Sequence, residues 1–110
     1  MDAKRLKRLK DQGWAVGDAA DFLELTPEEA EFVELKLALA AGLRDEREAQ
    51  GLTQVEVARR VGSSQSRVAK MEAADPSVSL DLIVRALFQL GAKRSDVAKL
   101  MRSRRARRTA

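Results

Sequence analysis

The chain has 110 residues, of which 45% are hydrophobic and 35% charged, a balance typical of one small folded domain with a heavily charged surface. It contains no cysteine, histidine or tyrosine, which excludes disulfides, thiolate nucleophiles, imidazole bases and Cys/His zinc sites. We therefore expect a protein that is not an enzyme and that uses no cofactor, metal or small-molecule substrate.

No apolar run approaches the roughly 20 residues that span a bilayer, and the basic N-terminus lacks the apolar core of a secretory signal. These two features predict a cytoplasmic protein without a membrane partner.

The net charge of +4 is unevenly distributed along the chain. Residues 1–14 carry five cations and two anions, residues 15–34 carry seven anions and no cation, and residues 93–110 carry eight cations and one anion. Such segregation is compatible with plain solvated helix faces. It is equally compatible with a basic partner for the acidic segment, an internal cover for it, or nucleic-acid contact by the basic end.

No stretch alternates between apolar and polar residues over the length of a strand, so the pattern predicts an all-α fold. Residues 1–27 form a predicted N-terminal extension. It contains a short basic helix over 3–10, an apolar loop around Trp14, and a short helix from Asp18 to Leu23.

A long helix is predicted from Thr26 to about Gln50. Thr26 is a suitable N-cap, Pro27 suits the first helical position, and Glu29 completes a capping box. The helix carries two apolar stripes, which consist of Phe32, Leu35, Leu39 and Leu43, and of Val33, Leu37 and Ala40. The second stripe would be covered either by the N-terminal extension, with Trp14 and Phe22, or by a second chain.

Residues 52–73 have the pattern of two short helices joined by a tight turn. Thr53 and Glu56 form a capping box for the first helix, and Gly62 allows the turn that ends it. Ser64 caps the second helix. The apolar residues predicted to face inward are Val55, Ala58 and Val61 on the first helix and Val68 and Met71 on the second.

Two further helices complete the predicted domain, which spans residues 28–101. One runs over 80–90 after a Ser79 cap, with an apolar face of Leu80, Ile83, Val84, Leu87 and Phe88. A last short helix is capped by Ser95. Residues 102–110 form a predicted disordered basic tail.

The second helix of the pair would expose Gln65, Ser66, Arg67 and Lys70. Glutamine can bond adenine through two hydrogen bonds, arginine can bond guanine in the same way, and serine adapts to several partners. This arrangement is typical of a helix-turn-helix, whose second helix enters the major groove of DNA.

The motif LTQ-x₃-A-x₃-G-x₂-Q-x₂-V-x₃-E lies within residues 43–92, a stretch that resembles the Cro/lambdoid-repressor (XRE) helix-turn-helix family. The resemblance implies a five-helix, lambda-repressor-like fold. It also implies that Gln54 bonds a phosphate and braces Gln65, that Gln65 reads a base, and that Arg47 and Glu72 form a structural salt bridge. The DNA-binding residues that follow are Gln54, Ser64, Gln65, Ser66, Arg67 and Lys70.

The flanking sequences are similar to those of small HigA-type antitoxins. That similarity implies a homodimeric repressor that binds a double-stranded DNA operator and a possible toxin partner. The dimer interface candidates are Phe88, Leu90, Val97, Leu100 and Met101. The alternative function is that of a protein-interaction adaptor of the transcriptional bridging type with the same fold, which would need an apolar patch on the second helix.

Overall fold

The computed structural model describes residues 25–103. The predicted N-terminal extension up to residue 24 and residues 104–110 of the predicted tail lie outside the described residues. The prediction that the disordered tail begins at residue 102 is wrong, because Arg102 is the last residue of a helix. The described part contains five helices and no strand, which confirms the all-α prediction. The helices are α3 (Pro27–Ala49), α4 (Gln54–Val61), α5 (Gln65–Glu72), α6 (Leu80–Gln89) and α7 (Arg94–Arg102). None of these helices combines the length and the apolar character that crossing a bilayer requires.

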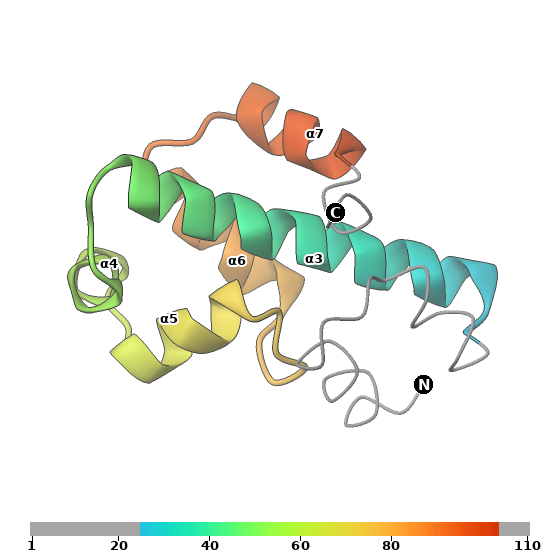
Figure 1. Ribbon diagram of the computed structural model, residues 1–110, viewed down its shortest axis with the longest axis horizontal. Coiled ribbons are helices and arrows are strands. Elements are labelled where there is room, and N and C mark those ends of the chain that lie inside the picture. The colour runs from blue at the N-terminus through green and yellow to red at the C-terminus, as the bar shows by residue number, and fades with distance from the viewer. Residues whose placement is uncertain (1–24, 104–110) are drawn as a thin grey trace.

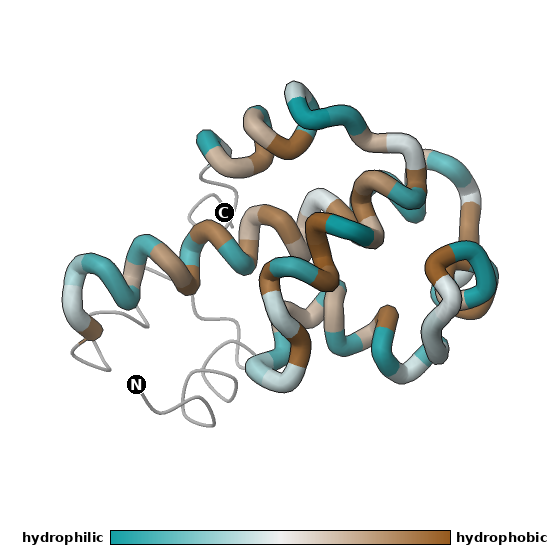
Figure 2. Tube along the Cα trace, turned by 180° about the vertical axis from the view of Figure 1, so that it is seen from behind, coloured by the Kyte–Doolittle hydropathy of each residue, from teal (hydrophilic) through white to brown (hydrophobic). Residues whose placement is uncertain are grey.

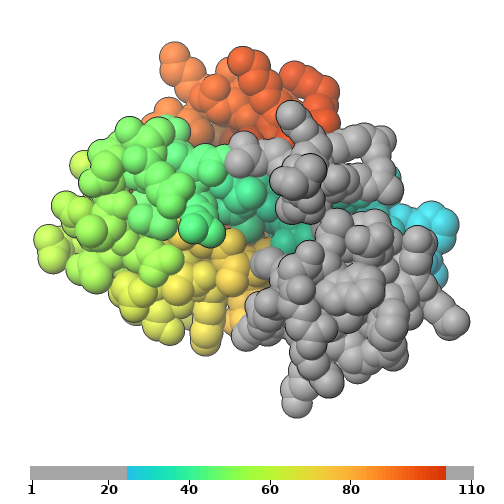
Figure 3. All heavy atoms as spheres, in the orientation of Figure 1, coloured from blue at the N-terminus to red at the C-terminus, as the bar shows by residue number. Residues whose placement is uncertain are grey.

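The long helix α3 is the axis around which the other helices are arranged (Figure 1). Helices α5, α6 and α7 all contact it, and α4 packs on α5 and α6. Figures 1 and 3 show α4 and α5 at one end of the molecule, whereas the first turns of α3 project at the other end.

The core forms where α3 meets α6 and the α4–α5 pair. Its largest fully buried side chains come from four helices: Leu39, Leu43, Val57, Val68, Ile83 and Leu87. Figure 2 shows hydrophobic segments of α3 and α6 gathered at their crossing. Apolar burial of this kind is the main force that holds short helices together, because each alone is too short to be stable in water.

The predicted helix caps are present at four of the five helices. The Thr26 hydroxyl accepts from the N–H of Glu29 at 3.2 Å, and the Glu29 carboxylate accepts from the N–H of Thr26 at 2.9 Å. The Thr53–Glu56 pair repeats this capping box on α4, and Ser64 and Ser79 cap α5 and α6.

The prediction that Ser95 caps the last helix is wrong. Helix α7 begins at Arg94, with Lys93 rather than Ser95 at the N-cap, two residues earlier than predicted, and the Asp96 carboxylate accepts from the N–H of Lys93 at 2.8 Å. A carboxylate in the first turn satisfies the free N–H and also interacts favourably with the helix dipole, so Asp96 replaces the serine hydroxyl as the capping group.

The two apolar stripes of α3 differ from the prediction at its exposed start. Leu39 and Leu43 are fully buried, but Phe32 is 50% exposed because the first turns of α3 project beyond the main core. Val33, from the second stripe, is buried. On α6, Phe88 is 41% exposed and does not belong to the buried face that was predicted for it.

A glycine allows α3 and α7 to approach each other closely. A Cβ atom built on Gly42 would lie 2.5 Å from Cδ1 of Leu100 and 2.6 Å from its Cδ2. The Leu100 side chain therefore packs directly on the α3 backbone, and Gly42 is buried.

We expect Gly42→Ala to lower the free energy of unfolding by on the order of 1 kcal/mol, because Leu100 must leave its position. In a Leu100→Ala background the same change should raise stability by up to about 1 kcal/mol, since alanine favours the helix more than glycine does. Urea unfolding of the four variants measures this reversal of sign. Equal effects in both backgrounds would show that the close approach is absent.

Candidate nucleic-acid interface

The helix-turn-helix consists of α4, α5 and the turn between them. Gly62 ends α4 in the left-handed conformation, with φ 68° and ψ 41°, and its N–H donates to the carbonyl of Ala58. Glycine adopts this conformation without strain, so α5 can begin after only two further residues. Ala58 and Val68 are buried between the helices, as predicted.

The predicted inward position of Val55 is wrong. Val55 is 50% exposed, whereas Val57 is fully buried. The short α4 packs against both α5 and α6, so its buried face is turned toward two neighbours rather than one. A pattern of apolar spacing within eight residues does not distinguish these two orientations.

The outer face of α5 is polar throughout. Gln65, Ser66, Arg67 and Lys70 are all exposed, and no exposed large hydrophobic side chain of the described residues lies on this helix. The Ser64 hydroxyl accepts from the N–H of Arg67 at 3.1 Å and keeps its own proton for donation. The first turn of α5 therefore presents donors and acceptors to solvent.

A chain of hydrogen bonds leads from the core to the tip of α5. The Arg47 guanidinium donates to both oxygens of the Glu72 carboxylate, from Nε at 2.6 Å and from Nη2 at 3.1 Å. Nε2 of Gln54 donates to the Glu72 Oε1 at 3.1 Å, and Nε2 of Gln65 donates to the Gln54 Oε1 at 2.6 Å. The chain thus joins α3, α5 and α4 and ends on an exposed glutamine.

The ionised carboxylate of Glu72 determines how both glutamines are oriented. A carboxylate only accepts hydrogen bonds, so Gln54 must present its NH₂ group to Glu72 and its carbonyl oxygen to Gln65. Gln65 must then direct its own NH₂ group toward Gln54. One N–H and the carbonyl oxygen of Gln65 remain available on the exposed side, in a fixed orientation.

The predicted Arg47–Glu72 ion pair is present and mostly buried. The side chains are 14% and 5% exposed, and Nη1 of Arg47 also donates to the Leu52 carbonyl at 3.0 Å. Hydrogen bonding to Glu72 raises the pKa of Arg47, although burial acts in the opposite direction. The spacing of the residues gave no sign that Gln54 also contacts Glu72, because they are 18 positions apart.

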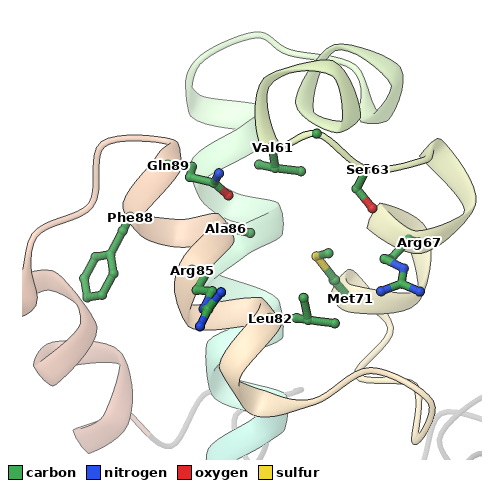
Figure 4. Close-up of a pocket in the computed structure, with 10 residues that line it drawn as sticks. Val61, Ser63, Arg67, Met71, Leu82, Arg85, Ala86, Phe88 and Gln89 are labelled. Carbon is green, nitrogen blue, oxygen red and sulfur yellow. The ribbon is translucent and has the colours of Figure 1, made fainter.

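A shallow groove of about 450 Å³ separates the helix-turn-helix from α6 (Figure 4). Val61 and Met71 contribute apolar surface, and Arg67 and Arg85 lie on opposite sides. Arg85 forms an exposed ion pair with Asp81 at 3.1 Å. Cations therefore lie on both α5 and α6 next to the exposed face of α5.

The predicted dimer candidates have different environments. Leu90 and Val97 are buried within the chain itself, at 5% and 7% exposure, and Leu100 packs against Gly42, so these three side chains offer little surface to a second copy. Phe88 is 41% exposed and Met101 is 51% exposed. Figure 4 shows Phe88 directed away from the groove.

Comparison with known protein families identifies a helix-turn-helix domain in the same part of the chain. The profile of a family described as a helix-turn-helix domain matches residues 38–100, which is more than half of the sequence. No match was found among curated proteins or among solved structures.

We expect Arg47→Ala to lower the free energy of unfolding by about 3 kcal/mol, because it leaves the buried Glu72 carboxylate without its cation. For a domain of this size, each kcal/mol corresponds to a fall in Tm of roughly 4–8 °C. The matched control is Arg44→Ala, which breaks an exposed pair with Glu48 and should cost less than about 1 kcal/mol. Equal losses of Tm in the two variants would contradict a structural role for the buried pair.

Proposed function

The chain belongs to the helix-turn-helix domain family, and from this premise we propose that it is a sequence-specific DNA-binding repressor of the Cro/lambdoid-repressor (XRE) type. The N-terminal end of α5 enters the major groove, and Gln65, its first residue, reads a base there. The observation that carries this proposal is the fixed orientation of the Gln65 side chain.

Gln65 can pair with adenine without losing its bond to Gln54. Its carbonyl oxygen accepts from the N6 amino group of the base, and its second N–H donates to N7. The first N–H continues to donate to Gln54. A side chain held in this way loses little conformational entropy on binding.

The other exposed residues of the helix-turn-helix fit the same geometry. Arg67 and Lys70 supply charge for phosphates or guanine, and Ser64 and Ser66 supply hydroxyl groups. Gln54 lies behind Gln65 and is available for a phosphate at the edge of the groove. The alternative role as an adaptor is disfavoured because the exposed face of α5 has no apolar patch.

We expect Gln65→Ala to weaken binding to the operator by about 1–3 kcal/mol and to relax the preference at one base pair. Folding should be unaffected, because the side chain is exposed. Selection of binding sites from a random DNA pool identifies the operator, and titration of single-base variants then measures the effect at each position.

The matched control is Gln89→Ala, which removes an exposed glutamine from α6 instead. It should leave the sequence preference unchanged. A folded Gln65→Ala protein with wild-type affinity and preference would overturn the assignment of Gln65 as a base-reading residue.

We further propose that the repressor is a homodimer on a pseudo-palindromic operator. Its two recognition helices would then lie about 34–36 Å apart, one turn of DNA. Phe88, the exposed large apolar side chain of α6, is the position on which this interface would depend.

We expect Phe88→Asp to raise the dimer dissociation constant at least about tenfold, since it places a charge in an apolar contact. Sedimentation equilibrium measures the constant. Val55→Asp, a change at a similarly exposed apolar side chain of α4, is the control and should have no effect. A wild-type protein that remains monomeric at high concentration would contradict the dimer and the palindromic operator together.

Within this function, we propose that the protein is the antitoxin and autorepressor of a toxin–antitoxin module. The support is the similarity of its flanking sequences to HigA-type antitoxins and the strongly acidic segment that continues into the projecting start of α3. The test is the neighbouring reading frame. A small basic ribonuclease-like protein encoded there should arrest growth when expressed alone and should co-purify with this chain; a neighbour without either property would overturn this part of the proposal.

A further inference from the structure

A second groove lies between the first half of α3 and the end of α7. Phe32, Leu35 and Met101 give it apolar surface, and its charged border consists of Glu31 and Glu34 on α3 and Arg102 at the end of α7, two anions against one cation. Figures 1 and 3 show this part of α3 at the opposite end of the molecule from α4 and α5. The groove is therefore separate from the proposed DNA-reading surface.

The chemistry of this groove suits arginine side chains. Phe32 is 50% exposed and Met101 is 51% exposed, so an apolar surface is open beside two carboxylates. Guanidinium groups pair with carboxylates and also stack on aromatic rings, which makes arginine the natural complement of such a surface.

The chain itself supplies an arginine-rich segment next to the groove. Ser103, the last described residue, lines the groove, and the seven residues that follow it contain four arginines and no anion. Seven residues span at most about 25 Å when extended. The acidic residues of α3 from Glu28 to Glu34 cover only about 9 Å at the helical rise, so the segment is long enough to reach all of them.

We propose that the groove between α3 and α7 is the docking site of the chain's own basic tail, residues 104–110. The arginines of the tail pair with Glu31 and Glu34, and one of them stacks on Phe32. Because the tail is joined directly to the groove, its effective concentration there is in the millimolar range, far above that of a separate chain. Exposed ion pairs are weak and are screened by salt, so the docking is reversible.

Docking has a consequence that rests on the proposed DNA-binding function. A docked tail is held at the end of the molecule opposite to α5, where its charges cannot contact the same stretch of DNA. Phosphates of DNA and the acidic border of the groove then compete for the same arginines. The acidic start of α3 therefore reduces non-specific attraction to DNA.

Paramagnetic relaxation in the full-length protein tests the docking directly. The chain contains no cysteine, so Ala106→Cys provides a single attachment point for a nitroxide label in the tail. We expect the backbone amide signals of residues 28–35 to broaden at low ionic strength, whereas those of residues 99–103 broaden at any salt concentration because they adjoin the labelled tail. The broadening over 28–35 should fall sharply at about 0.5 M salt, where the Debye length is only a few ångströms.

Two double variants distinguish docking in the groove from a general effect of the protein's charge. Glu31→Gln/Glu34→Gln should abolish the broadening over 28–35, whereas Glu46→Gln/Glu48→Gln, the same change of charge at the other end of α3, should preserve it. Unbroadened signals over 28–35 in the parent protein at low salt would overturn the proposal. So would broadening that arises only from a label at Asp2→Cys, or only between differently labelled chains, because the occupant would then be the N-terminal segment or a second copy.

The effect of docking on DNA affinity is measured by a thermodynamic cycle that combines Glu31→Gln/Glu34→Gln with removal of the tail. Glu31→Gln/Glu34→Gln should strengthen non-specific binding about three- to tenfold in the full chain at low salt, in keeping with the small contribution of exposed pairs. In a chain that ends at Ser103 the same change should have no effect. A gain that persists after truncation would contradict the competition, whereas a protein that binds no DNA at all would contradict the proposed function and leave the docking measurement intact.

Discussion

The carboxylate of Glu72 is the group on which the arrangement of the helix-turn-helix depends. It is 5% exposed, and a charge so deeply placed is tolerated only when it is paired and hydrogen-bonded. Arg47 from α3 and Gln54 from α4 provide those bonds. One side chain of α5 thus ties both preceding helices in a defined orientation, which apolar packing alone specifies less strictly.

The length of α3 separates the helix-turn-helix from the acidic surface at the start of this helix. Its second half carries Leu39 and Leu43 into the core and places Arg47 beside Glu72. Its first half extends past the core and carries Phe32 and the acidic residues to the opposite end (Figure 1). A single continuous helix therefore places the helix-turn-helix and an acidic surface at opposite ends of a small domain.

The sequence was sufficient to predict features that depend on neighbouring residues. The capping boxes at Thr26 and Thr53, the turn at Gly62 and the ends of α3 to α6 follow from local chemistry, and the structure contains them. Features that depend on the contact between distant elements were missed or misassigned. The orientation of α4, which buries Val57 instead of Val55, depends on α6 as well as α5, and the burial of Val97 depends on how α7 lies against α3.

The candidate site shows the same division. The motif predicted its residues and two of their contacts, namely the ion pair between Arg47 and Glu72 and the contact between Gln54 and Gln65. The connection between these pairs could not be predicted, because Gln54 meets Glu72 only after three helices have packed.

That connection makes stability and the proposed base reading interdependent. The carboxylate that holds the helices together also sets which way Gln54 faces, and Gln54 in turn sets which atoms Gln65 presents to solvent. A neutral amide in place of Glu72 could donate as well as accept, so both glutamines would lose their defined orientation even if the fold survived. The buried charge thus has a role that an apolar residue of the same size could not fill. Only a group that accepts hydrogen bonds and donates none restricts Gln54, and through it the exposed Gln65, to one orientation.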